Sequence, residues 1–457
     1  MRVTPVRAGP WVLLASLLAA PTQSAAGGEA LVDSLSRVRA ALASPEAALR
    51  ERGFGELEAC LARDAAACGG ALEALKDVLR LRSGAERARV ARLLLKLPGE
   101  DAMATWWSLL DPLKEDDDRV LGAAIEAVSD RASDPALARR LLEAARDPRL
   151  DGWRRALAVE ALGGLDSPAA PLVLFNPRPG ADWVEESCRA LALGRRGRAD
   201  CIAPLIGLLP HAEAPPRVHA WEMLVQLTHQ DLPLERGAWA AWWESQHGRL
   251  PAVPAAPQAG PGVDPYRPPA AAHIPRYYGV PVRAKGTSCH VVFCLDMSAS
   301  MKDHGIGPAR RHLADTLREF TTHASFDVVA FNENVLPFAG RLQRAHPITK
   351  ARAIRWLDAI VPKAYTNIYD AVETAFQYAG LGRTPSLTPE RLDLVFLLSD
   401  GAPNRGRYHV ADQVLAGIAA LSDRKVPVHT IGAGETVLPL LHDIAAATGG
   451  TFQQALD

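Results

Sequence analysis

The sequence has 457 residues, more than one hydrophobic core usually organises, so its length predicts two or three folded units. Its 51 Lys and Arg residues nearly balance its 52 Asp and Glu residues, which excludes a strong electrostatic attraction for nucleic acid or anionic lipid. The six cysteines include no Cys-x-x-Cys pair. The sequence therefore has neither a zinc-finger spacing nor a disulfide framework, although Cys60 and Cys68 flank a predicted turn and are candidates for one bridge.

Residues 1–26 have the pattern of an export signal. Arg2 and Arg7 give a positively charged start, and residues 11–20 form a short apolar stretch. Small residues at 24–26 then offer a cleavage site before Gly27. An uncleaved membrane anchor is the alternative, but the apolar stretch is about half as long as a bilayer span. The pattern predicts a protein exported to the periplasm or the extracellular space, with no membrane span in the mature chain.

Residues 27–248 have an almost purely helical pattern, with apolar residues three and four apart. Similar helix openings recur every thirty to thirty-four residues, at Arg89, Arg119, Trp153, Trp183 and Arg217. This period predicts stacked helix pairs and resembles degenerate HEAT-type repeats. An irregular helical bundle is the alternative. Near the end of the region Trp239, Trp242 and Trp243 stand at helical spacing, which is typical of a cap that seals a solenoid core.

Residues 249–286 are rich in Pro, Ala and Gly, a composition that excludes regular ladders and predicts a semi-rigid linker between two separately folded parts. The end of this linker differs from the rest because it contains Tyr277 and Tyr278. An aromatic pair is poorly suited to a free linker. We therefore expect residues 274–282 to dock on the domain that follows.

Residues 287–457 alternate short β-branched runs with amphipathic helices, which predicts a doubly wound, Rossmann-like α/β domain with a mostly parallel sheet. The predicted strands are residues 290–295, 326–331, 392–398 and 428–431, with short ones at 335–338 and near Thr451. The predicted helices are residues 308–323, 349–361, 368–379, 409–424 and 437–448. Ligands of such sheets bind at the carboxyl ends of the strands, so the loops there are the place to look for chemistry.

Three of those loops carry oxygen donors: Asp296, Ser298 and Ser300 after one strand, Thr366 before a helix, and Asp400 after another strand. The Asp-x-Ser-x-Ser motif together with Thr366 and Asp400 resembles the metal-ion-dependent adhesion site of von Willebrand factor A (VWA) domains. The one departure is Ala299, where this family often has glycine. The resemblance covers residues 288–457. It implies a divalent cation, Mg²⁺ or alternatively Mn²⁺ or Ca²⁺.

Oxygen ligands in a roughly octahedral array are what a hard cation such as Mg²⁺ requires. The resemblance implies that Ser298, Ser300 and Thr366 supply direct or water-linked hydroxyls, while Asp296 and Asp400 hold the metal or its waters. With only two carboxylates against two positive charges, the cation stays able to accept a carboxylate from a protein partner. Nearby, Asn367 is expected to support the loop, and Lys302, Asp303 and His304 lie where they would tune partner choice if they are more than solvated loop.

No enzyme signature accompanies this site. An aspartyl phosphotransferase needs a second acid two residues after Asp296, where Ser298 stands. A serine hydrolase needs a Gly-x-Ser-x-Gly elbow, and a phosphate-binding loop needs Gly-x-x-x-x-Gly-Lys, and both are absent from the sequence. The sequence therefore predicts a non-enzymatic adaptor that binds protein partners through the cation site and the solenoid. The alternatives are a non-catalytic subunit of an envelope-associated enzyme or ATPase complex, and a structural protein whose metal only stabilises its loops.

Overall fold

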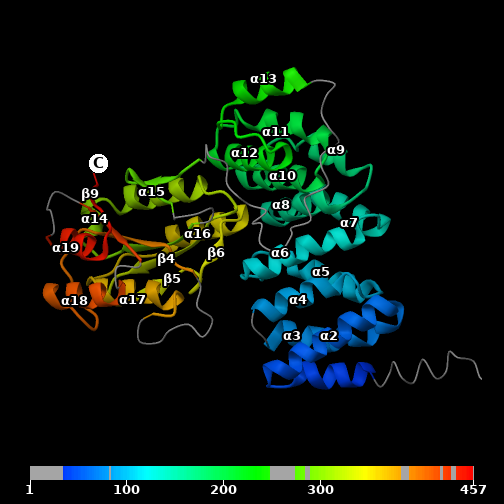
Figure 1. Ribbon diagram of the computed structural model, residues 1–457, viewed down its shortest axis with the longest axis horizontal. Helices are drawn as coiled ribbons and strands as arrows, with labels where there is room; N and C mark the ends of the chain where they lie inside the picture. Colours follow the sequence, from blue (N-terminus) through cyan, green and yellow to red (C-terminus); the bar gives the residue numbers. More distant parts are fainter. Residues whose placement is uncertain are drawn as a thin grey trace, which may run out of the picture.

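The computed structural model describes residues 34–81, 84–246, 273–283, 289–381, 391–422, 426–433 and 439–455. The predicted export signal and most of the predicted linker lie outside these residues. The described chain forms a helical domain, residues 34–246, and an α/β domain, residues 273–455, which stand side by side (Figure 1).

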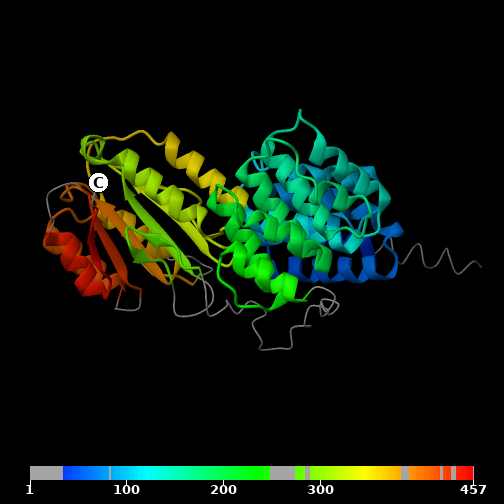
Figure 2. The same ribbon diagram turned by 90° about the horizontal axis from the view of Figure 1, so that it is seen from above.

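The helical domain is a stack of α-helices (Figures 1 and 2). After a first helix at residues 34–43, its α-helices are α2 (Ala47–Arg63), α3 (Leu72–Leu81), α4 (Gly84–Leu94), α5 (Glu100–Leu109), α6 (Asp118–Glu126), α7 (Pro135–Arg146), α8 (Gly152–Ala161), α9 (Ala170–Leu174), α10 (Trp183–Arg196), α11 (Ile202–Leu208), α12 (Ala214–Thr228) and α13 (Arg236–Gln246). Aspartates recur just before α6, α8 and α10. The Asp117, Asp151 and Asp182 carboxylates accept hydrogen bonds from the first free backbone N–H groups of those helices, which fixes where each one begins.

Helices α4, α6, α8, α10 and α12 begin close to the five openings that the sequence period predicts, and they follow one another along the stack. Neighbouring helices approach closely: a Cβ on Gly163 would stand 2.5 Å from the Ala192 carbonyl oxygen, so only glycine fits there. The all-helical layered architecture is confirmed, while the specific resemblance to HEAT repeats stays a prediction. At the end of the stack Trp239 is fully buried, and its indole N–H donates to the Pro233 carbonyl at 2.9 Å. Trp242 and Trp243 pack beside it on the same core, as a cap requires.

The α/β domain contains a seven-stranded sheet in the order β5-β4-β3-β7-β8-β9, with β6 also paired to β4. Strands β3 (His290–Asp296), β4 (Ser325–Phe331), β7 (Leu394–Ser399), β8 (Val428–Gly432) and β9 (Phe452–Gln454) are parallel. The short strands β5 (Val335–Pro337) and β6 (Gln343–Arg344) run antiparallel to β4. All predicted strands are present, while β6 and the short hairpin at residues 276–281 were not predicted.

Helices cover both faces of the sheet, as the doubly wound prediction requires. They are α14 (Met301–His304), α15 (Ile306–Arg318), α16 (Pro347–Ala359), α17 (Ile368–Tyr378), α18 (Ala411–Ser422) and α19 (Pro439–Thr448). The core on one face is built with α15 and α16, and the core on the other with α17, α18 and α19. The hairpin of β1 (Arg276–Tyr277) and β2 (Val280–Pro281) joins the first of these cores: Tyr277 is 1% exposed and packs edge-on against Phe293 and Phe396. The expected docking of the aromatic pair is confirmed.

The two domains share a buried polar interface that the sequence did not predict. Successive helices of the stack present acidic groups to the α/β domain: Asp118 of α6 binds Arg341, Glu160 of α8 binds His346, and Glu222 of α12 binds Thr322. The first turns of α16 carry Ile348 and Ala351 into the hydrophobic core of the helical domain. Figures 1 and 2 show α16 beside the stack. Separate folding of the two parts stays a prediction.

Two further expectations concern cysteines and the membrane. Cys60 and Cys68 are buried, and both are free thiols, so the candidate bridge is not formed in this structure. Among the helices of the described residues, none combines the length and the apolar character that crossing a bilayer requires.

Candidate metal site

The candidate site lies where two adjacent parallel strands end. Asp296 is the last residue of β3, and Asp400 follows β7, which pairs directly with β3. Because both strands point the same way, their carboxyl ends bring these two loops together. Thr366 lies two residues before α17, in a third loop at the same edge.

The structure brings the five predicted residues into one cluster. Asp296 Oδ1 accepts a hydrogen bond from the Ser298 backbone N–H at 2.8 Å, and Ser300 Oγ donates to Asp400 Oδ1 at 2.8 Å. The hydroxyl oxygens of Ser298 and Ser300 are 3.1 Å apart. Thr366 joins them at Gly401, where an added Cβ would stand 3.4 Å from Thr366 Oγ1 and 3.8 Å from Ser300 Oγ. The cluster thus holds three hydroxyls and two carboxylates.

The charges of this cluster suit a bound cation. Asp296 is fully buried, and burial raises the pKa of its carboxyl group to about 7, with the nearby negative charge of Asp400 adding to the effect. Asp400 Oδ2 is buried and has no hydrogen-bond partner among the described residues, although buried carboxylate oxygens are normally paired. A divalent cation would offset the repulsion between these two carboxylates and would bind Asp400 Oδ2, so the residues fit the implied metal.

Residues outside the motif hold the Thr366 loop in place. The Asn404 side-chain oxygen accepts from the Thr366 N–H at 2.8 Å, and the Asn404 N–H donates to the Thr366 carbonyl at 3.1 Å. Asn367 caps α17 and binds Asp370 through its side-chain amide, as expected of a loop-supporting residue. Gly406 has φ +97°, and a Cβ there would stand 1.9 Å from Asn367 Oδ1. Sequence reasoning missed Asn404 and Gly406, because no local pattern links them to Thr366.

The rim of the site carries an unusual aromatic residue. Tyr365, immediately before Thr366, has φ +69° and is 50% exposed. Bulky side chains rarely adopt this left-handed conformation, which costs of order 1–3 kcal/mol. The Arg405 guanidinium lies 5.7 Å from the centre of the Tyr365 ring. Lys302 is also exposed at this edge.

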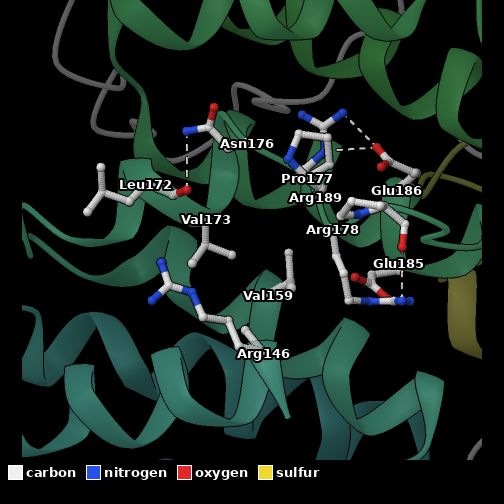
Figure 3. Close-up of a pocket in the computed structure, with 12 residues that line it drawn as sticks. Arg146, Val159, Leu172, Val173, Asn176, Pro177, Arg178, Glu185, Glu186 and Arg189 are labelled. Carbon is white, nitrogen blue, oxygen red and sulfur yellow. Dashed lines mark hydrogen bonds and ion pairs between the residues drawn. The ribbon is translucent and has the colours of Figure 1, made fainter. Parts of the chain in front are cut away.

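A second hollow lies in the helical domain, near α7, α9 and α10 (Figure 3). Its volume is about 340 Å³, and Val159, Leu172 and Val173 are among its apolar lining residues. Its cations are largely matched within it: Arg178 is 3.0 Å from Glu185, and Arg189 is 2.6 Å from Glu186. Internally paired charges leave little to attract a charged ligand, so this pocket is a weaker candidate than the strand-end cluster.

Comparison with known proteins agrees with this geometry. Residues 289–454 match the family profile described as von Willebrand factor type A domain. Inter-alpha-trypsin inhibitor heavy chain H4 of Bos taurus is 30% identical over 118 residues, which are 26% of this chain and 13% of the bovine protein. Heavy chain H2 of Mus musculus is 30% identical over 123 residues, 27% of this chain and 13% of the mouse protein. The chain therefore matches about one eighth of the length of these relatives.

Solved structures are also similar to part of the chain. A von Willebrand factor type A protein from Catenulispora acidiphila covers 38% of this chain and 39% of its own at 21% identity, with a TM-score of 0.32. BatB from Bacteroides thetaiotaomicron covers 36% of this chain and 89% of its own at 17% identity, with a TM-score of 0.28. On the family match, residues 289–454 form a VWA domain, and the chain places this domain after an all-helical region.

Proposed function

We propose that this chain is an exported, non-enzymatic adaptor whose VWA domain binds a divalent cation through Asp296, Ser298, Ser300, Thr366 and Asp400 and uses it to capture a carboxylate of a protein partner. The observation that supports the proposal best is the meeting of these five oxygen-bearing side chains, where one buried Asp400 oxygen has no hydrogen-bond partner in the described part of the chain. Mg²⁺ is the expected cation, with Mn²⁺ and Ca²⁺ as alternatives.

Each residue has a distinct task in the proposed site. The Ser298, Ser300 and Thr366 hydroxyls are neutral ligands, so they leave the positive charge of the cation largely uncompensated. Asp296 and Asp400 hold the metal or its waters, and Asn404 holds Thr366 against the site. When bound, the cation supplies an electrophilic position that accepts a carboxylate. Binding of this kind needs no general acid, base or nucleophile, which agrees with the lack of an enzyme motif in the sequence.

The test is a titration of the full mature chain with Mg²⁺ and Mn²⁺ by calorimetry, followed by partner capture from envelope extracts with and without chelator. Asp296→Ala and Asp400→Ala should weaken cation binding by at least about 10 to 100-fold, because each removes a charged oxygen from the site. Thr366→Ala should also weaken binding. Asp412→Ala is the matched control, because this aspartate is exposed and lies outside the five positions.

The outcomes separate the proposal from its alternatives. If the wild-type chain binds no divalent cation at millimolar concentration, the cation site is wrong. If Asp296→Ala captures the same partners as the wild type, the metal only stabilises the loops, and the chain is the structural protein. Capture of a complete enzyme or ATPase assembly would identify the chain as a non-catalytic subunit instead.

A further inference from the structure

A second group of metal-binding side chains lies at the domain interface. Glu160 comes from α8, Cys188 from α10, and His346 from the residue that caps α16. One ligand atom from each lies within 4.8 Å of the other two. Glu160 and Cys188 are buried, while the His346 side chain is 17% exposed. Two domains thus contribute a carboxylate, a thiol and an imidazole to one buried point.

We propose that Glu160, Cys188 and His346 form a second cation site, one that takes Zn²⁺ or a similar borderline-soft cation and joins the helical domain to the VWA domain. The donors are nitrogen, sulfur and oxygen, the set that Zn²⁺ favours and that Mg²⁺ and Ca²⁺ do not. The site differs in this way from the all-oxygen cluster at the strand ends, and it does not depend on the function proposed for that cluster.

In the structure a hydrogen bond joins two of the three groups. His346 Nε2 is 2.6 Å from Glu160 Oε2, and a ligand atom of each of these residues lies within 4.8 Å of the Cys188 sulfur. The other oxygen of Glu160, Oε1, binds Arg195 at 3.2 Å. This arrangement leaves Oε2 facing the imidazole. An ion pair would need only Glu160 and a positively charged side chain. The buried Cys188 thiol near the carboxylate is therefore a feature that an ion pair does not explain.

Cation binding requires two proton movements. The Cys188 thiol loses its proton to solvent, so that the thiolate and the Glu160 carboxylate match the two positive charges of the cation. The neutral His346 ring keeps one proton but moves it from Nε2 to Nδ1, which frees the Nε2 lone pair. Cation binding therefore gives up two hydrogen bonds, the 2.6 Å contact between Nε2 and Glu160 Oε2 and the 3.3 Å contact in which Nδ1 accepts from the Ile348 N–H, and forms three metal–ligand bonds.

The neighbouring lysine does not occupy the site. Lys350 Nζ is directed at backbone oxygens, 2.9 Å from the Phe320 carbonyl and 3.4 Å from the Arg318 carbonyl. Three protein ligands would leave one tetrahedral position for water, and access is from the partly exposed edge of His346. A cation there would tie α8 and α10 to the start of α16 and so hold the two domains together.

The experiment uses the full mature chain carrying Asp296→Ala, so that failure of the strand-end site does not affect the result. We expect this chain to bind one equivalent of Zn²⁺ by calorimetry and to show a thiolate-to-metal absorption band when titrated with Co²⁺. Adding Cys188→Ser should abolish the band and weaken Zn²⁺ binding more than about 100-fold, since even loss of a supporting group costs 10 to 100-fold. Cys201→Ser is the matched control, because Cys201 is another buried thiol outside the three-residue group.

The Co²⁺ spectrum of the Asp296→Ala chain decides the question even if Cys188→Ser fails to fold. Absence of Zn²⁺ binding at micromolar concentration, or a Co²⁺ complex with no thiolate band, would overturn the proposal and leave an interdomain ion pair. Equal loss of binding in Cys201→Ser and Cys188→Ser would overturn it too.

Discussion

Removing the Glu222 carboxylate should weaken the docking of the two domains. Glu222 is 3% exposed, and its two oxygens each accept from the Thr322 backbone N–H at 3.1 Å. The Thr322 hydroxyl donates to the same carboxylate, and His323 Nε2 is 3.2 Å away. Glu222→Ala leaves the Thr322 N–H and hydroxyl buried without this acceptor, since Thr322 is itself only 6% exposed. Truncating one side of a buried, charged hydrogen-bond group costs about 2–5 kcal/mol, so we expect a loss of about 3 kcal/mol.

The assay is urea unfolding of the full chain followed by tryptophan fluorescence and by circular dichroism. Within residues 289–457 the sequence contains one tryptophan, Trp356, so fluorescence reports mainly on the helical domain while circular dichroism reports on both. Glu222→Gln keeps an acceptor oxygen and should lose less than Glu222→Ala. Glu244→Ala, an exposed glutamate on α13, is the matched control and should change stability by no more than about 0.5 kcal/mol.

Equal stabilities of Glu222→Ala and Glu244→Ala would refute the reasoning, because they would mean that the Glu222–Thr322 contact is open in solution. A loss confined to the helical domain would be a different failure. It would show that Glu222 stabilises α12 without holding the α/β domain.

Three further predictions concern pH, the linker and export. Burial lowers the pKa of Lys350 to about 7, so between pH 7 and its ordinary value of 10.5 the unfolded chain holds more protons on this lysine than the folded chain does, and folding stability gains as pH rises. Between pH 7.5 and 9, the free energy of unfolding should rise with pH by up to about 1.4 kcal/mol per pH unit on account of this lysine, and Lys350→Met should remove that rise. Urea unfolding in the presence of chelator measures it, and an unchanged pH dependence in Lys350→Met would mean that the lysine titrates normally. Proteolysis within residues 249–272 should leave the C-terminal fragment folded and still attached to the helical domain on gel filtration, and an unfolded fragment would show that the domains share one core. N-terminal sequencing of envelope protein should find Gly27 or a neighbour, whereas Met1 would show an uncleaved anchor.

The α/β domain was predictable because its strands are short and nearly continuously apolar. Parallel strands that are buried on both faces have such continuous apolar sequences. Strand β3 (His290–Asp296) ends in the first residue of the motif, Asp296. Because ligands of such sheets bind at strand ends, the sequence pointed to Asp296 and Asp400. In the structure Asp400 accepts a hydrogen bond from Ser300, in the loop that follows Asp296. Strand β6 was missed because its two residues, Gln343 and Arg344, have neither an apolar run nor alternation.

The domain interface was not predictable for a different physical reason. Glu160, Cys188 and His346 are each ordinary in their local sequence, and Glu160 and His346 are 186 residues apart. Only the packing of α8, α10 and α16 brings them together. The proline-rich composition of residues 249–272 describes the connection between the domains, but it carries no information about surfaces that meet elsewhere.

One helix connects this interface to the candidate cation site. The first turns of α16 place Ile348 and Ala351 in the core of the helical domain, and the loop after its last residue, Ala359, leads to Thr366. That loop is fixed to the motif, because the Lys363 N–H donates to the Met297 carbonyl at 3.1 Å and Lys363 pairs with Ser298 as an isolated bridge. A helix transmits displacement of one end to the other because its backbone hydrogen bonds make it stiff. We therefore expect the cation affinity of an isolated VWA domain to differ from that of the full chain, and equal affinities by calorimetry would mean that docking of the helical domain does not reach the loop that holds Thr366.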